Sequence, residues 1–197
     1  MELVPDKIEA FLKFDDVVNS NEQIRKSTDA LICSRIEIER VAAIFNWVRD
    51  TISHSKDFGH ECVTCTSSEV LHHRTGICFA KSHLLASMMR YAGIPCGFCY
   101  QVFENPANRN CNGFTLHGLN AVYVQSTRSW QRIDPRGNRS DISAVFSKGN
   151  ESLAFPDLDF LDDKVYASPL PVVIDGLKTA ESISSLWPHL PSIANDR

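Results

Sequence analysis

Apolar residues recur at three- and four-residue intervals in two stretches of the chain, the spacing that places them on one face of a helix. The first stretch covers residues 35–52, and its apolar stripe consists of Val41, Ile44, Phe45, Val48 and Ile52. The second covers residues 78–91, and its stripe consists of Leu84, Leu85, Met88 and Met89. The turn-forming pair Thr75-Gly76 precedes this second stretch, and Gly93 and Pro95 end it. The pattern therefore predicts two helices and puts Cys78 in the first turn of the second.

Three runs rich in β-branched and aromatic residues follow, at residues 96–103, 116–124 and 130–133. Polar stretches separate them, so we expect a small antiparallel meander. Before the second helix, Ser67-Ser68-Glu69 is typical of the start of a short helix, and residues 54–61 are typical of a connector. Beyond residue 141 the periodicity weakens and prolines become frequent. We expect a single domain over residues 1–197, with a core of about residues 36–140 and an extension of residues 141–197 that wraps the core or frays.

Composition excludes several function classes. The chain has 197 residues, of which 43% are hydrophobic and 22% are charged, as in an ordinary globular protein. A net charge of −4 without clusters of Lys and Arg argues against a nucleic-acid partner. The sequence has neither a long apolar segment nor a signal-peptide pattern, so we expect a cytoplasmic protein that does not bind membranes. The chain has seven cysteines, and we expect most of them to be reduced thiols rather than parts of a disulfide framework.

The placement of Cys78 gives one of these thiols a chemical role. A helix N-terminus favours the thiolate, which is the nucleophilic form, and its unpaired N–H groups can bind an oxyanion. His117 lies near the start of the second predicted strand and is followed by Gly118, where a close backbone approach costs little. Asp134 ends the third strand. If these strands form a hairpin, Asp134 comes close to His117 and can orient its ring, although a symmetric turn centred on Thr127 would place Asp134 opposite Asn120.

Four segments in order resemble the core of the transglutaminase-like superfamily: Arg74-Thr75-Gly76-Ile77-Cys78-Phe79-Ala80-Lys81, Met89-Arg90-Tyr91-Ala92-Gly93-Ile94-Pro95, His117-Gly118-Leu119-Asn120-Ala121-Val122-Tyr123 and Trp130-Gln131-Arg132-Ile133-Asp134-Pro135-Arg136. The resemblance implies an α+β fold with a papain-like core, in which N-terminal helices and the nucleophile helix pack on a small antiparallel sheet. It also implies a catalytic triad of Cys78, His117 and Asp134. Many members of the family have an aromatic residue two positions after the histidine, where this chain has Leu119.

Several other residues are weaker candidates for a functional site. Gln101, in the first strand after the nucleophile helix, and Gly76 are candidates for binding substrate or an oxyanion. Two Cys-x-x-Cys pairs, Cys62 with Cys65 and Cys96 with Cys99, could suggest zinc, but Cys96 and Cys99 fall in a strand whose odd spacing sends them to opposite faces. Cys111 is expected to be a plain loop thiol. We expect His60, His72, His73 and His83 at the surface or as helix caps.

The sequence thus predicts an enzyme, a cysteine hydrolase or acyltransferase acting on a peptide, a protein or a small amide through a thioester on Cys78. Water or an amine would resolve the thioester, and no metal or organic cofactor is needed. Two alternatives stay open. One is transfer from an acyl-coenzyme A, because arylamine acetyltransferases are similar in their order of Cys, His and Asp. The other is a non-catalytic binding module that has kept the fold. The oligomeric state is not evident from the sequence.

Overall fold

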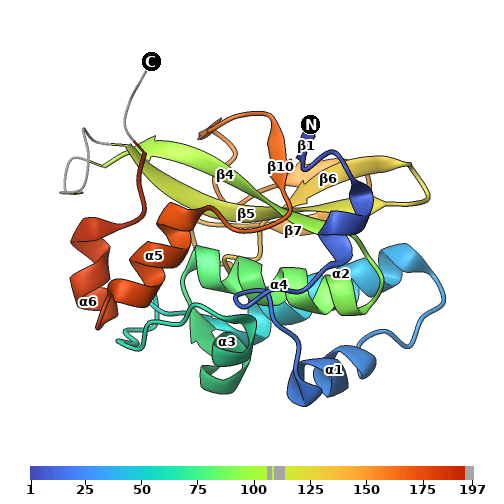
Figure 1. The fold of residues 1–197 in the computed structure, drawn as a ribbon, viewed down its shortest axis with the longest axis horizontal. Coiled ribbons are helices and arrows are strands. Elements are labelled where there is room, and N and C mark those ends of the chain that lie inside the picture. The colour runs from blue at the N-terminus through green and yellow to red at the C-terminus, as the bar shows by residue number, and fades with distance from the viewer. Residues whose placement is uncertain (106–107, 109–113, 194–197) are drawn as a thin grey trace.

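The computed structural model describes residues 1–105, 108 and 114–193. Most helices precede a long run of consecutive strands, and Figure 1 shows a sheet with helices packed beneath it. The helical elements are η1 (Ile8–Leu12), α1 (Glu22–Asp29), α2 (Glu37–Thr51), α3 (Ser67–His73), α4 (Cys78–Tyr91), α5 (Pro171–Thr179), α6 (Ile183–Leu186) and η2 (Trp187–His189). The strands are β1 (Glu2–Val4), β2 (Ser53–His54), β3 (Thr75–Gly76), β4 (Cys96–Glu104), β5 (Phe114–Val124), β6 (Ser129–Ile133), β7 (Val145–Ser147), β8 (Asn150–Ser152), β9 (Asp159–Phe160) and β10 (Lys164–Tyr166).

The predicted meander forms the centre of the main sheet. Strands β4, β5 and β6 pair antiparallel in sequence order, which confirms the three predicted runs to within two residues at each end. The sheet continues on the other side of β4 through β10 and β1, and β9 also pairs with β4. The strands from the C-terminal extension were not predicted, because they are only two or three residues long and show no alternation of their own. The extension therefore completes the sheet as well as covering it.

Helix α4 is the central helix of the domain. Every residue from Phe79 to Arg90 is buried, because α2 and α3 contact it from one side and the sheet lies on the other. A helix covered all round carries little amphipathic signal, so the apolar stripe seen in the sequence describes only part of its packing. The N-terminus of α4 coincides with the predicted one, at Cys78.

Close packing ties α4 to strand β5. A Cβ added at Gly118 would lie 2.5 Å from Cδ1 of Phe79, so only glycine allows the strand to approach the first turn of the helix this closely. Two hydrogen bonds strengthen this contact: Ser82 Oγ donates to the Gly118 carbonyl at 3.3 Å, and Asn120 Nδ2 donates to the Ser82 carbonyl at 3.1 Å. These contacts fix the height of β5 above the start of α4.

A buried arginine holds the other end of α4. Arg90 Nε and Nη2 donate to the Cys96 carbonyl at 3.0 and 2.8 Å. Its remaining bonds reach the carbonyls of Lys13 and Ala167, so a single guanidinium connects α4, the start of β4 and both terminal regions. The Arg-x-x-Gly-Ile-Pro motif of the sequence therefore has a structural role, because its arginine connects these parts of the fold. Gly93, at φ +75°, makes the turn that brings β4 back over the helix.

The structure differs in detail from the predicted connector and the predicted short helix. The connector predicted at residues 54–61 begins with β2, which pairs parallel to β3 so that His54 lies beside Gly76. The short helix α3 begins at Ser67, and its capping box is formed by Thr66 and Glu69. Cys111 lies outside the described residues. Within the part of the chain that the structure describes, no helix has both the length and the apolar character needed to cross a membrane.

Candidate active site

Cys78 is the first residue of α4, and its side chain is partly exposed. The residue before it, Ile77, occupies the N-cap position, so no side chain of the described residues caps this helix terminus. The N–H groups of a first helical turn have no intrahelical acceptors, and the helix dipole makes this end positive. The sulfur of Cys78 thus lies beside hydrogen-bond donors that are suited to an anion.

The register of β5 and β6 explains how Asp134 reaches His117. Asn120 pairs with Ile133, so Asp134 follows the ladder beside Leu119, two residues from His117 and on the same side of the strands. This is one residue tighter than the symmetric turn considered from the sequence. His117 Nε2 hydrogen-bonds to Asp134 Oδ2 at 2.8 Å, and the other ring nitrogen is left for Cys78. The structure therefore brings the three predicted residues together.

The Asp134 carboxylate is fully buried and is held at both oxygens. Oδ1 accepts a hydrogen bond from the Arg136 backbone N–H at 3.0 Å, and Oδ2 also accepts one from the Ala154 N–H at 3.2 Å. Burial alone would raise the pKa of Asp134, but His117 and these two N–H groups hold it below its ordinary value. A buried ionised carboxylate is therefore fixed beneath the imidazole.

His117 is buried as well, and burial alone would lower the pKa of its ring. The Asp134 carboxylate, followed by the hydrogen-bonded sulfur of Cys78, outweighs burial and raises the pKa of His117 to about 10. The ring packs edge-on against Phe155, with the centroids 4.9 Å apart. The arrangement favours an imidazolium that lies between the buried Asp134 carboxylate and the Cys78 sulfur.

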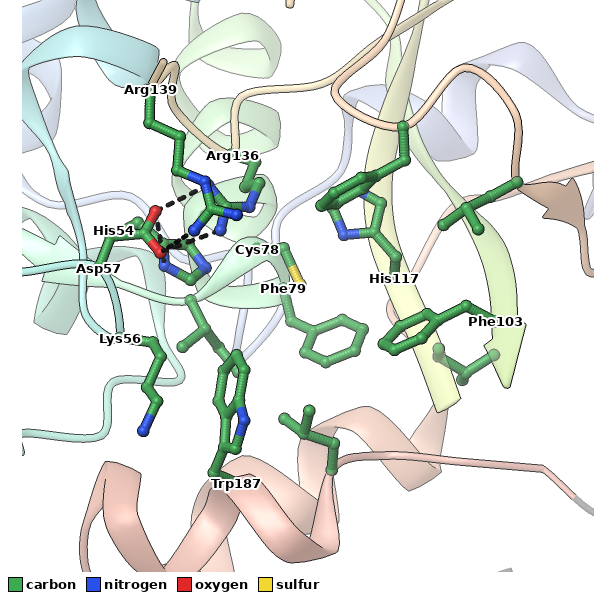
Figure 2. A pocket seen from close by; sticks show the side chains of 15 residues that line it. His54, Lys56, Asp57, Cys78, Phe79, Phe103, His117, Arg136, Arg139 and Trp187 are labelled. Carbon is green, nitrogen blue, oxygen red and sulfur yellow. Dashed lines mark hydrogen bonds and ion pairs between the residues drawn. The ribbon is translucent and has the colours of Figure 1, made fainter. Parts of the chain in front are cut away.

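Cys78 and His117 open onto a cavity of about 600 Å³. In Figure 2 the sulfur lies near the centre, with a group of charged side chains on one side and His117 and Phe103 on the other. The cavity is lined by His54, Lys56, Asp57, Ile77, Cys78, Phe79, Phe103, Leu116, His117, Arg136, Arg139, Phe155, Leu158, Trp187 and Leu190. Its size is in the usual range for sites that bind small molecules or peptide side chains, roughly 300–1,000 Å³.

Comparison with known proteins identifies the family of this chain. The sequence model of the Transglutaminase-like superfamily matches residues 21–135, more than half of the chain. The chain belongs to the transglutaminase-like superfamily. That match contains Cys78, His117 and Asp134, and it supports a cysteine-based hydrolase or acyltransferase as the general class of this protein.

One solved structure supports the same α+β fold. A candidate cysteine protease from Cytophaga hutchinsonii superimposes with a TM-score of 0.52 at 15% sequence identity, over 76% of this chain and 63% of that one. This chain thus spans less than two thirds of the length of that protein. The periplasmic domain of TgpA from Pseudomonas aeruginosa, in its form bound to ethylmercury, gives a TM-score of 0.48 at 21% identity, over 66% of this chain and 49% of that one. No curated protein matches the sequence.

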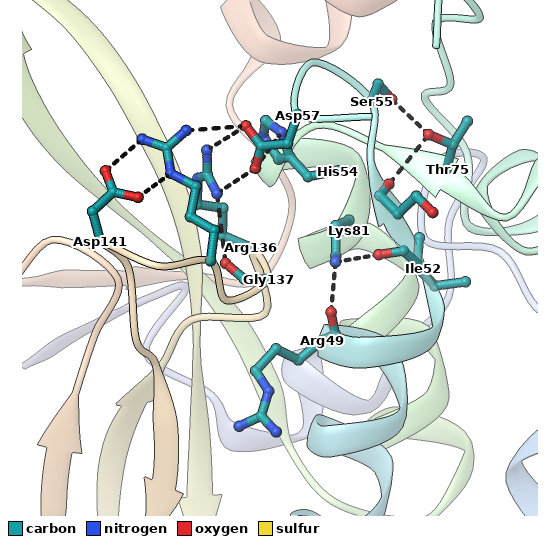
Figure 3. Close-up of polar contacts among 12 residues, drawn as sticks. Arg49, Ile52, His54, Ser55, Asp57, Thr75, Lys81, Arg136, Gly137 and Asp141 are labelled. Atoms are coloured by element: carbon teal, nitrogen blue, oxygen red, sulfur yellow. Dashed lines mark hydrogen bonds and ion pairs between the residues drawn. The ribbon is translucent and has the colours of Figure 1, made fainter. Parts of the chain in front are cut away.

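A charged cluster on the cavity wall was not expected from the sequence. Asp57 accepts two hydrogen bonds from Arg136, at 2.7 and 3.1 Å, and one from Arg139 at 3.4 Å (Figure 3). His54 lies 3.4 Å from the same carboxylate, and burial followed by the charge of Arg136 lowers the pKa of His54 to about 3. Arg136 directly follows the Asp-Pro pair of the family motif, which was the only sequence signal for this cluster. His54 is thus a neutral imidazole in the wall of a transglutaminase-like site.

Lys81 is buried one turn along α4 from the nucleophile. Its Nζ donates to the carbonyls of Arg49 and Ile52, at the C-terminal end of α2, as Figure 3 shows. Burial lowers the pKa of this ammonium group to about 7. Lysine is favourable at a helix C-terminus, so Lys81 connects the end of α2 to the start of α4. It acts on the site by holding the nucleophile helix in place.

The structure places the two weaker candidates as follows. Gln101 is buried opposite His117 in the β4–β5 ladder, and its Nε2 donates to the carbonyls of Phe155 and Leu158 at 2.9 and 3.2 Å. Both N–H donors are thereby used in holding the loop that carries Phe155, and Gln101 is not among the residues that line the cavity. Gly76 packs against α4, since a Cβ there would meet the Ala80 Cβ at 3.0 Å. These contacts give both residues positioning roles.

The remaining cysteines and histidines lie elsewhere. Cys96 and Cys99 pack in different apolar clusters on opposite faces of β4, as their spacing predicts, and burial raises the pKa of each to about 12. No group of metal-ligating side chains occurs among the described residues. The expectation for His83 was wrong: its side chain is buried in the core, and Nδ1 lies 2.6 Å from the Cys65 carbonyl. Because α4 is covered on all sides, a polar position within it did not indicate the surface.

The raised pKa of His117 predicts how stability depends on pH. A pKa raised from 6.5 to about 10 stabilises the folded protein fully below pH 6.5, and this contribution is lost as pH rises to about 10. Relative to a His117→Gln variant, we expect the unfolding free energy of the wild type to fall by about 1–3 kcal/mol between pH 7 and 10 in urea titrations.

The lowered pKa of Lys81 acts in the opposite direction, because the unfolded state binds more protons in this range. That effect is present in both proteins and cancels in the comparison. Parallel stability curves for the two proteins from pH 7 to 10 would contradict a charged His117.

Proposed function

We propose that this protein is a cysteine-nucleophile hydrolase or acyltransferase that acts on peptide or side-chain amides through a thioester on Cys78. The observation that carries the proposal is the single line of contacts from Asp134 through His117 to Cys78 at an uncapped helix N-terminus, beside an open cavity. The natural substrate would be a peptide, a protein or a small amide. The geometry supports catalysis better than a binding-only role, because a binding module has no need to bury a carboxylate in order to orient an imidazole.

In the acylation step the Cys78 sulfur attacks the carbonyl carbon, a C–S bond forms, and negative charge develops on the carbonyl oxygen. The N–H groups of the first turn of α4 are placed to stabilise that charge. When the intermediate collapses, the C–N bond breaks and His117 donates its proton to the departing amine. Asp134 keeps the ring in position and stabilises its charged form.

In the second step the neutral His117 accepts a proton from water or from an amine as that molecule attacks the thioester. The C–S bond then breaks, and the sulfur leaves as a thiolate beside the re-formed imidazolium. Water gives hydrolysis and an amine gives transfer. The same residues serve both outcomes, so the acceptor depends on what the cavity admits next to Cys78.

Alkylation tests the nucleophile directly. At neutral pH, we expect iodoacetamide to modify Cys78 at least about tenfold faster than the exposed Cys33 and Cys62, because His117 and the helix N-terminus favour the thiolate. Peptide mapping by mass spectrometry at short reaction times measures the order of modification. Faster modification of Cys33 or Cys62 in the folded protein would contradict the assignment of Cys78.

The Asp134→Asn variant tests the third member of the triad. An amide still fills the buried site but stabilises an imidazolium less well than a carboxylate does. We expect kcat/KM for hydrolysis of p-nitrophenyl acetate to fall roughly 10- to 1,000-fold, equal to about 1.4–4 kcal/mol of transition-state stabilisation. His117→Ala is the comparison, since it removes the proton carrier itself and should lower the rate further. Full activity in the Asn variant would leave a dyad of Cys78 and His117.

A further inference from the structure

The cavity beside Cys78 has two chemically different halves. One half is apolar and is built by β4, β5, the loop before β9 and the C-terminal segment. Its side chains are Phe103, Leu116, Phe155, Leu158 and Leu190. The other half is built by the loop after β2 and the loop after β6, and it carries Lys56, Asp57, Arg136 and Arg139. In Figure 2 these halves lie on either side of the Cys78 sulfur, and Trp187 lies below it.

The positively charged side chains of the second half differ in whether they are already paired with a carboxylate. Arg136 uses its guanidinium on Asp57, and Arg139 is shared between Asp57 and Asp141. Lys56 has no carboxylate partner at salt-bridge distance among the described residues, although its charge interacts with the carboxylate of Glu61. Its Nζ instead lies 5.1 Å from the centroid of the Trp187 ring, at the edge of the cavity.

The Glu61 carboxylate, which interacts with this ammonium group by charge, is held in place by Ser184. Glu61 accepts hydrogen bonds from the backbone N–H and the hydroxyl of Ser184, at 2.9 and 2.7 Å. Lys56 is an exposed cation that lines a largely apolar cavity and lies over an aromatic face. A cation beside low-dielectric walls attracts a negatively charged ligand more strongly than the same cation on an open surface does.

We propose, on the basis of the function proposed above, that the substrate is an acyl donor with two recognition elements. A bulky apolar group binds against Phe103 and Leu158, and an anionic group, such as a carboxylate, binds beside Lys56 with Arg139 nearby. The reacting carbonyl lies between them at Cys78. The cavity volume of about 600 Å³ suits a ligand of this size, such as an apolar amino-acid residue together with a neighbouring acidic one.

Three alkylating reagents test both elements without a known substrate. Each forms an S–C bond at Cys78 as its C–I bond breaks and iodide leaves. Iodoacetamide is neutral, iodoacetate is similar in size but anionic, and N-phenyl iodoacetamide is neutral with an apolar ring. The second-order rate constant for modification of Cys78 is measured with each, and the two ratios to iodoacetamide report charge and apolar preference.

The charge element is tested by Lys56→Gln, which keeps most of the side chain over Trp187 but removes its charge. We expect the iodoacetate to iodoacetamide ratio to fall about 3- to 10-fold, and the fall to shrink at high salt. Lys7→Gln is the matched control, because Lys7 is an exposed lysine outside the cavity lining, and its ratio should equal that of the wild type.

The apolar element is tested by Phe103→Ala and Leu158→Ala. In each, we expect the N-phenyl iodoacetamide to iodoacetamide ratio to fall about 3- to 10-fold, because part of the apolar contact is lost. Phe14→Ala is the control, since Phe14 is 44% exposed and does not line the cavity. Circular dichroism before each measurement establishes that the variant is folded.

The outcomes separate the two proposals. If Cys78 of the wild type reacts with none of the reagents faster than Cys33 does, the proposed function fails. If Cys78 reacts fast but the Lys56 and Phe103 variants keep the wild-type ratios, the proposed function stands and the substrate class is wrong. If only one of the two ratios changes, the recognition element that the unchanged ratio tests is wrong, and the other element stands.

Discussion

The hydrogen bond between His117 and Asp134 is the interaction on which the site depends. Burying a carboxylate is costly unless it is paired and hydrogen-bonded, so Asp134 is stable only with the imidazolium and the two backbone N–H groups that surround it. The same bond occupies Nε2 of His117 and leaves the other ring nitrogen for Cys78. Strand register, ring orientation and charge state are thereby linked. A shift of β6 by one residue would turn Asp134 to the other face of the sheet. His117 would then lose both the group that orients its ring and the charge that keeps it protonated.

The chemistry and the walls of the cavity come from different parts of the chain. The family match ends at Pro135 and contains the triad, whereas Phe155, Leu158, Trp187 and Leu190 lie beyond it. The extension also supplies the Ala154 N–H that binds Asp134. The extension is therefore part of the site. It also forms most of the apolar half of the cavity.

The sequence predicted those features that depend on local pattern. The helix over residues 78–91, the three strands after it and the order of Cys78, His117 and Asp134 follow from periodicity and motif, and the structure agrees. The one-residue difference in the β5–β6 register could not be read from the sequence, because the length of a hairpin turn is set by its backbone geometry.

Features that depend on distant contacts were missed for a physical reason. Strands β9 and β10 exist because β4 has a free edge to pair with, and strands of two or three residues carry no pattern of their own. Asp57 and Arg136 are 79 positions apart and are joined only by the fold. His83 was misread because its helix is buried on every side.

The protonation state of His117 decides whether the site holds an imidazolium. Nuclear magnetic resonance of protein with ¹⁵N-labelled histidine reports whether each ring nitrogen carries a proton. We expect both nitrogens of His117 to be protonated at pH 8, and the ring to lose a proton only as pH approaches about 10. A Cys78→Ser variant should show a lower transition, because the sulfur contributes to the raised pKa. A neutral His117 ring at pH 8 in the wild-type protein would contradict an imidazolium held by Asp134.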